Sequence, residues 1–239
     1  MSERQFALDL GHSPAFGRDD FLVAPCNAEA VAWLERWPAW PAHGLILYGP
    51  PGSGKSHLLA AFAAAHADAG AVVVAAADLD DASIPGLVDG QRIVLVDDID
   101  RLRAESALFH LHNLTRETGR FLVLAASRPP SHLPVRLPDL ASRLNALPAV
   151  GIGAPDDAVL AAVMVKQFAD RQLKVGEEVI AFLVGRMERS FAAARLLVEA
   201  IDRTSLTEKR AITVPLARMV LDGIDDRQGE LPWRTANGR

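Results

Sequence analysis

One short segment constrains the fold of this chain more than any other: Gly49-Pro50-Pro51-Gly52-Ser53-Gly54-Lys55-Ser56. It has the spacing G-x-x-x-x-G-K-[ST] and stands between an apolar run, 44–48, and a helical stretch that begins at His57. Glycines at these positions let backbone N–H groups approach phosphate oxygens, and the N-terminus of the following helix favours negative charge. The pattern in this context predicts a binding site for the phosphates of a nucleoside diphosphate or triphosphate.

Each residue of this phosphate loop has an expected part in such a site. Lys55 supplies positive charge to the β- and γ-phosphates, and the Ser56 hydroxyl ligates Mg²⁺. The predicted nucleotide-binding residues of the stretch are Pro50, Pro51, Gly52, Ser53, Gly54, Lys55, Ser56 and His57.

Short apolar runs follow the loop and alternate with helical stretches. The runs are continuously apolar, which is typical of strands covered on both faces. Strand–helix alternation predicts an α/β fold with a parallel sheet and right-handed crossovers. The predicted strands are 44–48, 71–77, 93–96, 121–125 and 149–152, and the clearest helices between them are 57–69 and 104–118.

After Gly153 the pattern changes to helices alone. We expect them over 156–172, 177–188, 191–208 and 214–223, with Ser190 as the N-cap of the third. The chain is therefore expected to contain an α/β domain and a helical domain. The expected boundaries are a flexible arm over 1–20, the α/β domain over 21–153, the helical domain over 154–224 and a polar tail over 225–239.

Polar residues follow two of the predicted strands at the carboxyl edge of the sheet. Asp97 is predicted to lie on the Mg²⁺ side and Asp98 to polarise an attacking water, although both could simply begin the next helix. Ser127 could reach a γ-phosphate or its water, or be an ordinary turn residue. Arg143 stands among apolar neighbours, as a surface charge or as an arginine finger for a neighbouring subunit.

Composition excludes several other classes of function. The net charge of −5 disfavours autonomous binding to nucleic acid, because neutralising phosphates requires a basic surface. Cys26 is the only cysteine, so neither an internal disulfide nor a cysteine metal site is expected. No apolar run reaches about 18 residues, and the N-terminal residues lack the layout of a secretory signal. A cytoplasmic location is therefore expected.

In their order along the chain, these segments resemble the DnaA/Hda branch of the AAA+ ATPases, from about residue 20 to 224. The resemblance implies a five-stranded parallel sheet in the order 5-1-4-3-2 with a small all-helical lid. The stretches that carry it are Phe21-Leu22-Val23 with Asn27, Gly52 to Leu59, Asp97-Asp98-Ile99, Phe109 to Asn113, Ser127-Arg128-Pro129-Pro130 and Leu140 to Leu144.

The resemblance also implies roles for residues outside the loop. Phe21, Leu22, Val23 and Asn27 would contact the adenine, and Arg143 would act as an arginine finger in trans.

The lid departs from the pattern of the branch. Ala192 stands where the branch usually has an arginine that senses the γ-phosphate, and Arg189 and Arg195 are possible substitutes. Of these, Arg195 is the predicted nucleotide contact, although it could equally be a solvated residue of the lid. Ser127 also stands where DnaA-like proteins often carry an aspartate. We therefore expect weak intrinsic ATPase activity.

Within the branch, the chain resembles the Hda regulators. Gln5-Phe6-Ala7-Leu8-Asp9-Leu10 is similar to the peptide with which they bind the sliding clamp, the beta subunit of DNA polymerase III, through Gln5, Leu8 and Leu10. The resemblance to Hda leads us to expect a protein without the helix-turn-helix DNA-binding domain of DnaA.

The resemblance to this group implies a protein that holds ADP or ATP with Mg²⁺, docks on the clamp and stimulates ATP hydrolysis by DnaA. A homodimer or larger oligomer is also possible. The alternatives are a helicase loader, another DnaA-like replication ATPase, an autonomous ATP-driven enzyme or transposition helper, and a degenerate nucleotide-binding scaffold.

Overall fold

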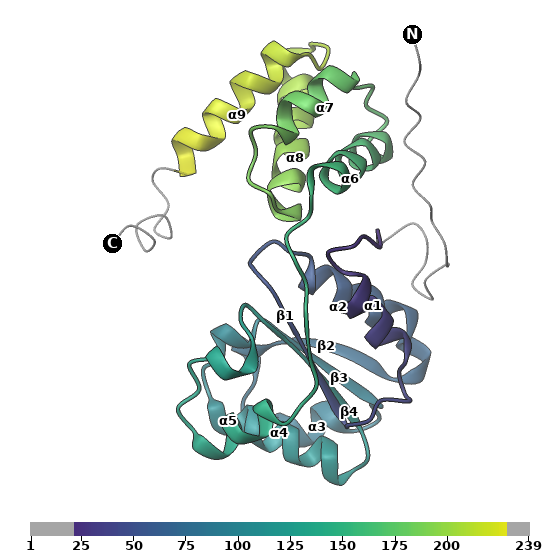
Figure 1. Cartoon of the computed structure of the whole chain (residues 1–239), viewed down its shortest axis with the longest axis vertical. Helices are drawn as coiled ribbons and strands as arrows, with labels where there is room; N and C mark the ends of the chain where they lie inside the picture. Colours follow the sequence, from purple (N-terminus) through teal and green to yellow (C-terminus); the bar gives the residue numbers. More distant parts are fainter. Residues whose placement is uncertain (1–21, 229–239) are drawn as a thin grey trace. The chain divides into compact units, whose positions relative to one another are not determined.

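The computed structural model describes residues 22–228, with side chains as far as Ile224. Within this range the chain forms two compact units (Figure 1). One unit consists of residues 22–49 and 55–152, and the other of residues 50–54 and 153–228. The first is called the sheet unit below and the second the helical unit. The predicted roles of Gln5, Leu8, Leu10 and Phe21 lie outside the described residues.

The sheet unit is built on five parallel strands in the order β2-β3-β4-β1-β5. This confirms the predicted fold class and strand order. The strands are β1 Gly44–Tyr48, β2 Ala71–Ala75, β3 Ile93–Asp97, β4 Phe121–Ala126 and β5 Ala149–Gly151.

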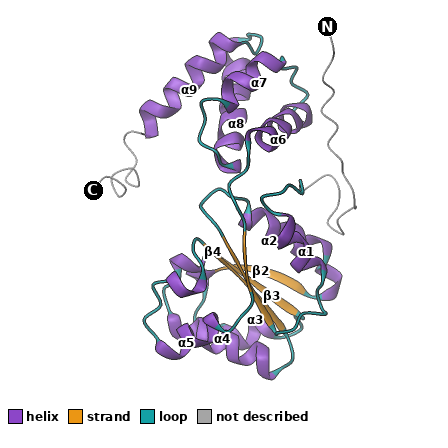
Figure 2. Cartoon of the chain, in the orientation of Figure 1, coloured by secondary structure: helices purple, strands orange, loops and turns teal. Residues whose placement is uncertain are grey.

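Both faces of the sheet are covered by helices (Figure 2). Side chains alternate along each strand, so Leu45 and Leu47 pack on one face while Ile46 packs on the other. One face carries α1 Ala28–Glu35 and α2 Lys55–Ala65, and the other carries α3 Ile84–Val88, α4 Glu105–Glu117 and α5 Pro138–Asn145. The inner strands β1, β3 and β4 are buried on both faces, which explains their continuously apolar sequences, whereas the edge strand β2 is only partly covered.

Parallel pairing places the carboxyl ends of neighbouring strands at one edge of the sheet. In the register of β1 and β4, Tyr48 lies opposite Ala126, and the Gly49 N–H donates to the Ala126 carbonyl at 3.2 Å. Ser127 therefore follows its strand at the point where the phosphate loop begins. Asp97 ends the adjacent strand β3, at this same edge.

The helical unit packs four helices around its own apolar core. These are α6 Asp157–Asp170, α7 Glu177–Val184, α8 Phe191–Glu208 and α9 Val214–Gln228. The Ser190 hydroxyl accepts a hydrogen bond from the Ala193 N–H at 3.1 Å, which confirms the predicted N-cap of α8. No helix in the range 22–228 is long and apolar enough to cross a membrane.

Candidate functional site

The middle of the phosphate loop belongs to the helical unit. Gly52 and Gly54 have φ values of 74° and 97°, a backbone region that other residues rarely adopt. The Gly52 carbonyl accepts a hydrogen bond from the Phe191 N–H at 2.9 Å. A Cβ atom on Gly52 would lie 2.8 Å from the Cβ of Ser190, so space as well as conformation requires glycine there.

Ser53 is 2% exposed, and its hydroxyl has no hydrogen-bond partner among the described residues. Its backbone N–H donates to the Pro50 carbonyl at 3.2 Å. A buried hydroxyl without a partner is uncommon in folded proteins, and it fits a loop shaped to accept a polar ligand.

Lys55 begins α2 within the sheet unit, and its Nζ donates to the Gly49 carbonyl at 2.7 Å. Burial lowers the pKa of Lys55, and the carboxylates of Asp100, Asp97 and Asp98, in decreasing order, oppose that shift. Three carboxylates therefore act on the lysine that was predicted to bind phosphate. Ser56 and His57, in the first turn of α2, are exposed.

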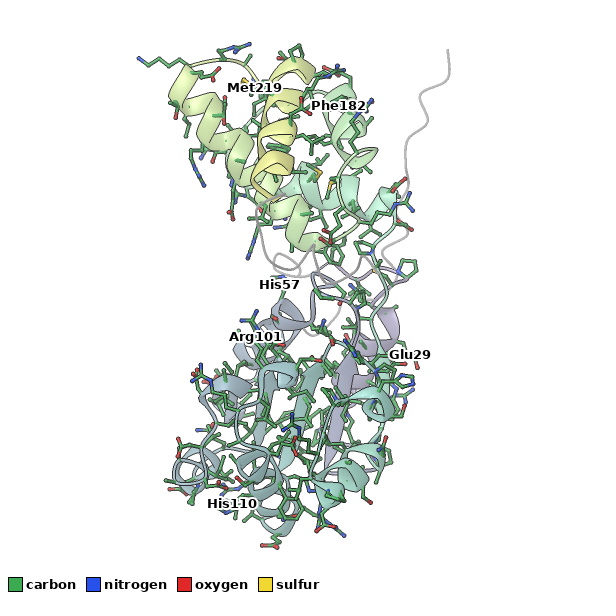
Figure 3. All side chains as sticks on the ribbon, turned by 90° about the vertical axis from the view of Figure 1, so that its left-hand side faces the viewer. Glu29, His57, Arg101, His110, Phe182 and Met219 are labelled. Carbon is green, nitrogen blue, oxygen red and sulfur yellow. The ribbon has the colours of Figure 1, made fainter. Side chains whose placement is uncertain are left out.

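The two aspartates after β3 differ in conformation. Asp97 is the last residue of the strand, whereas Asp98 has left-handed backbone angles, φ 55° and ψ 58°. Asp98 Oδ2 lies 3.0 Å from Arg101 Nε. Burial raises the pKa of Asp98, while Arg101 opposes the shift. Figure 3 shows Arg101 and His57 at one end of the sheet unit and His110 at the other.

Ser127 is held by an aspartate that sequence reasoning missed. The Ser127 N–H donates to Asp100 Oδ2 at 2.6 Å, and the Ser127 hydroxyl donates to Asp100 Oδ1 at 2.6 Å. Asp100 lies in the short 3-10 turn η3, Ile99–Arg101, directly after β3. The signal that could have found it was a third acidic residue three positions after Asp97, beside the end of the neighbouring strand.

Arg143 lies on α5 in different surroundings. Its Cζ is 4.9 Å from the centre of the Phe109 ring on α4. Its charge helps to lower the pKa values of His43 and His112, for which burial is the main cause. Within the described part of the chain Arg143 forms no ion pair, and its charge is not among those that shift the pKa of Lys55.

The segment predicted to contact adenine is held together by Asn27. The Asn27 Oδ1 accepts from the Ala24 N–H at 2.8 Å, and its Nδ2 donates to the Leu22 carbonyl at 3.0 Å. Asn27 is 2% exposed, and Val23 packs against the apolar core beneath α1 and α2. Asn27 thus shapes the turn that carries Leu22 and Val23.

The two arginines considered for the lid both have acidic partners within the helical unit. Arg195 Nε lies 3.8 Å from Glu199, one turn along α8, and Arg189 lies 3.1 Å from Asp157. Both are more than half exposed. Ala192, in the first turn of α8, provides no charge.

Family models match most of both units. Residues 45–148 match the ATPase family associated with various cellular activities (AAA), and residues 156–221 match the lid domain of Hda.

Solved structures share the fold at low identity. Domain III of the Thermotoga maritima replication initiation protein DnaA is 21% identical with a TM-score of 0.75, over 88% of this chain and 97% of that one. AMPPCP-bound DnaA from Aquifex aeolicus is 20% identical with a TM-score of 0.64, over 82% and 70%. The Thermotoga maritima RuvB Holliday junction branch migration motor is 15% identical with a TM-score of 0.65, over 82% and 67%.

A parallel sheet in this order, a phosphate loop followed by the pair Asp97-Asp98, and the two family matches agree with one another. The chain is an AAA+ protein with an Hda lid domain, and it shares its fold with domain III of DnaA.

Proposed function

We propose that this chain holds a nucleotide in its phosphate loop and uses Arg143 to stimulate ATP hydrolysis by DnaA, while docked on the sliding clamp. The function is regulatory inactivation of DnaA, a control on the initiation of replication. The observation that carries the proposal is the state of Arg143. Arg143 is half-buried, its guanidinium lies over the Phe109 ring, and it forms no ion pair with the described residues. Such a cation suits a phosphoryl group on another molecule.

The chain's own site suits the phosphates of ADP or ATP. Backbone N–H groups of the loop would surround the phosphates, and Lys55 would contribute its charge. Ser56 and Asp97 are the proposed ligands of Mg²⁺, which neutralises charge on the phosphate oxygens when bound. Magnesium usually takes one or two protein ligands and completes its shell with water and phosphate, so a hydroxyl and a carboxylate fit it.

We propose that nucleotide turnover at this site is slow. Asp98, the candidate for polarising water, is paired with Arg101 at 3.0 Å. Ala192 stands where a lid arginine would sense the γ-phosphate, and Arg189 and Arg195 have acidic partners of their own. The resident nucleotide would then be ADP, held as a structural ligand.

Phe109 is the proposed positioning residue for Arg143. Its ring at 4.9 Å restricts the guanidinium, so less side-chain freedom is lost when the arginine meets a phosphoryl group. Docking on the clamp rests on the sequence of the N-terminal segment, in which Gln5 would fill a polar site and Leu8 and Leu10 an apolar pocket.

A reconstitution tests the proposal. The protein is mixed with clamp loaded on DNA and with ATP-bound DnaA, and phosphate release is followed. We expect the wild-type chain to accelerate release, Arg143→Ala to abolish the acceleration and Gln5→Ala to reduce it strongly. An arginine finger contributes about 10³- to 10⁵-fold to the rate, so its loss is easy to detect.

Arg92→Ala is the matched control. Arg92 also lies over an aromatic ring, 5.2 Å from the centre of Trp37, but it precedes β3 at the opposite edge of the sheet from the phosphate loop. This variant should stimulate like the wild type. Absence of stimulation by the wild-type chain would refute the proposed function. Stimulation that survives Arg143→Ala would refute the role of that arginine, and indifference to Gln5→Ala would refute docking through this peptide.

A further inference from the structure

Asp100 accepts hydrogen bonds from both donors of Ser127, so neither donor is available to a ligand. A serine offers one backbone N–H and one hydroxyl hydrogen. The N–H donates to Asp100 Oδ2 and the hydroxyl to Asp100 Oδ1, both at 2.6 Å. Bonds of this length to a carboxylate are the strong, charge-assisted kind. In this arrangement Ser127 presents only acceptor lone pairs to its surroundings.

The Asp100–Ser127 pair lies beside the start of the phosphate loop. Ser127 directly follows Ala126, whose carbonyl accepts the N–H of Gly49 at the start of the phosphate loop. Of the three carboxylates that act on Lys55, Asp100 acts most strongly. The pair therefore lies at the carboxyl edge of the sheet, where the outermost phosphate of a nucleotide held by a phosphate loop is expected.

A γ-phosphate at this edge would need hydrogen-bond donors and positive charge. Its oxygens are anionic acceptors, and Ser127 as held here offers them no donor. The carboxylate of Asp100 adds negative charge in the same place, which disfavours a further anion. A β-phosphate, bound through the loop backbone, is less affected by either feature.

We propose that Asp100 is a positioning residue that makes the nucleotide site select a nucleoside diphosphate over a triphosphate, by occupying both donors of Ser127 and placing a carboxylate where the γ-phosphate would lie. The inference rests on the proposed nucleotide site and names what that site selects. It also names a residue that acts through another, since Asp100 controls what Ser127 can donate.

Calorimetric titration of the full chain with ADP and with AMPPCP, each with Mg²⁺, tests this selection. The quantity of interest is the ratio of the Kd for AMPPCP to the Kd for ADP. Asp100→Ala frees the hydroxyl and N–H of Ser127 and removes the charge. We expect the ratio to fall by about 10-fold or more, the usual size of a hydrogen bond to a charged group. Adding Ser127→Ala to Asp100→Ala should reverse the part of that fall that comes from the freed hydroxyl.

Asp81→Ala is the matched control. Asp81 Oδ2 accepts the Ser106 hydroxyl at 2.7 Å, so the substitution also removes a serine–aspartate hydrogen bond. Asp81 Oδ1 lies 3.9 Å from Nδ1 of His110, which Figure 3 shows at the far end of the sheet unit from Arg101. The ratio should remain at its wild-type value. A purely structural role for Asp100 would weaken both nucleotides together and leave the ratio unchanged.

The titrations separate a failure of the nucleotide site from a failure of the selection by Asp100. If wild-type chain binds neither nucleotide, the proposed nucleotide site itself is wrong. If it binds them and Asp100→Ala leaves the ratio unchanged, only the selection by Asp100 is wrong. Loss of affinity for both nucleotides that vanishes when Mg²⁺ is replaced by EDTA would make Asp100 a metal ligand and overturn the proposal. Should Asp100→Ala not fold, Asp100→Asn keeps the side-chain size and should shift the ratio in the same direction.

Discussion

Lys55 and Arg143 are two cations of the same sheet unit, and their surroundings differ in charge. Three aspartates act on Lys55. Arg143 lies over the Phe109 ring and beside His43 and His112, whose pKa values are lowered. A lysine among carboxylates is balanced within the chain, whereas an arginine beside aromatic rings and neutral histidines retains its charge for a partner. The contrast supports a resident nucleotide near Lys55 and a foreign phosphoryl group near Arg143.

Replacing Arg143 by lysine tests whether the shape of the arginine, as well as its charge, is needed to act on a partner's phosphoryl group, and the largest effect is expected here. Lysine keeps the charge but lacks the planar fork that stacks on Phe109 and reaches two phosphoryl oxygens. We expect Arg143→Lys to lower the stimulated rate of ATP hydrolysis on DnaA by about 10³-fold, nearly as much as alanine. The measurement is phosphate release in the reconstituted system. Near-normal rates with lysine would mean that a point charge is sufficient.

Lys55→Ala tests the proposed resident nucleotide near Lys55. The variant loses the cation of the phosphate loop and leaves Asp97, Asp98 and Asp100 facing the site. We expect the affinity for ADP to fall by about 100-fold, from the lost charge-assisted hydrogen bonds and the uncompensated carboxylates. Titration with a fluorescent ADP analogue measures it. Lys166→Ala is the control, because Lys166 is an exposed lysine that pairs with Asp170 on α6. Unchanged ADP binding in Lys55→Ala would contradict the site.

The neutral histidines beside Arg143 predict a pH-dependent stability. Burial, and then His43, lower the pKa of His112 from 6.5 to about 4. Between these values the unfolded chain binds a proton that the folded chain does not. The free energy of unfolding should therefore be highest above pH 6.5. It should decrease as the pH falls towards 4, and His112 should account for up to about 3 kcal/mol of the decrease.

Denaturant unfolding between pH 4 and 7 measures this decrease. His112→Phe should flatten it, because the variant keeps an aromatic ring and loses the titratable imidazole, whose Nδ1 has no partner among the described residues. His132→Phe changes an exposed histidine and should leave the slope as in the wild type. A slope that is equally steep in His112→Phe would show that another group is responsible.

The smallest effect is expected for Arg101→Ala. Arg101 pairs with Asp98 at 3.0 Å, but its side chain is 79% exposed. Exposed ion pairs of this kind contribute about 0 to 1 kcal/mol, so the free energy of unfolding should change by about 0.5 kcal/mol or less. Thermal unfolding checks this. A larger loss would mean that the acidic cluster near Lys55 depends on Arg101 for its balance.

The sequence predicted the sheet more completely than the site. All five strands are continuously apolar and could be located, including the partly exposed edge strands β2 and β5, and the family resemblance supplied their order. The helices α3 Ile84–Val88 and α5 Pro138–Asn145 were not predicted as helices, because five and eight residues are too few for a clear helical period. Asp100 was missed for a different reason. Its partner Ser127 is 27 residues away, and only the pairing of β3 with β4 brings the two together.

The left-handed backbone at Asp98 has a consequence for how such a protein could change during evolution. With φ at 55°, this position favours asparagine, aspartate or glycine. The Asp-Glu pair of many AAA+ proteins would place a longer residue on this backbone, at a cost of about 1 kcal/mol. The same turn leads into η3, which carries Asp100 to Ser127. A single backbone conformation thus restricts which residues suit position 98 and also directs the turn that brings Asp100 to Ser127, so a substitution at position 98 would be felt at Ser127 as well.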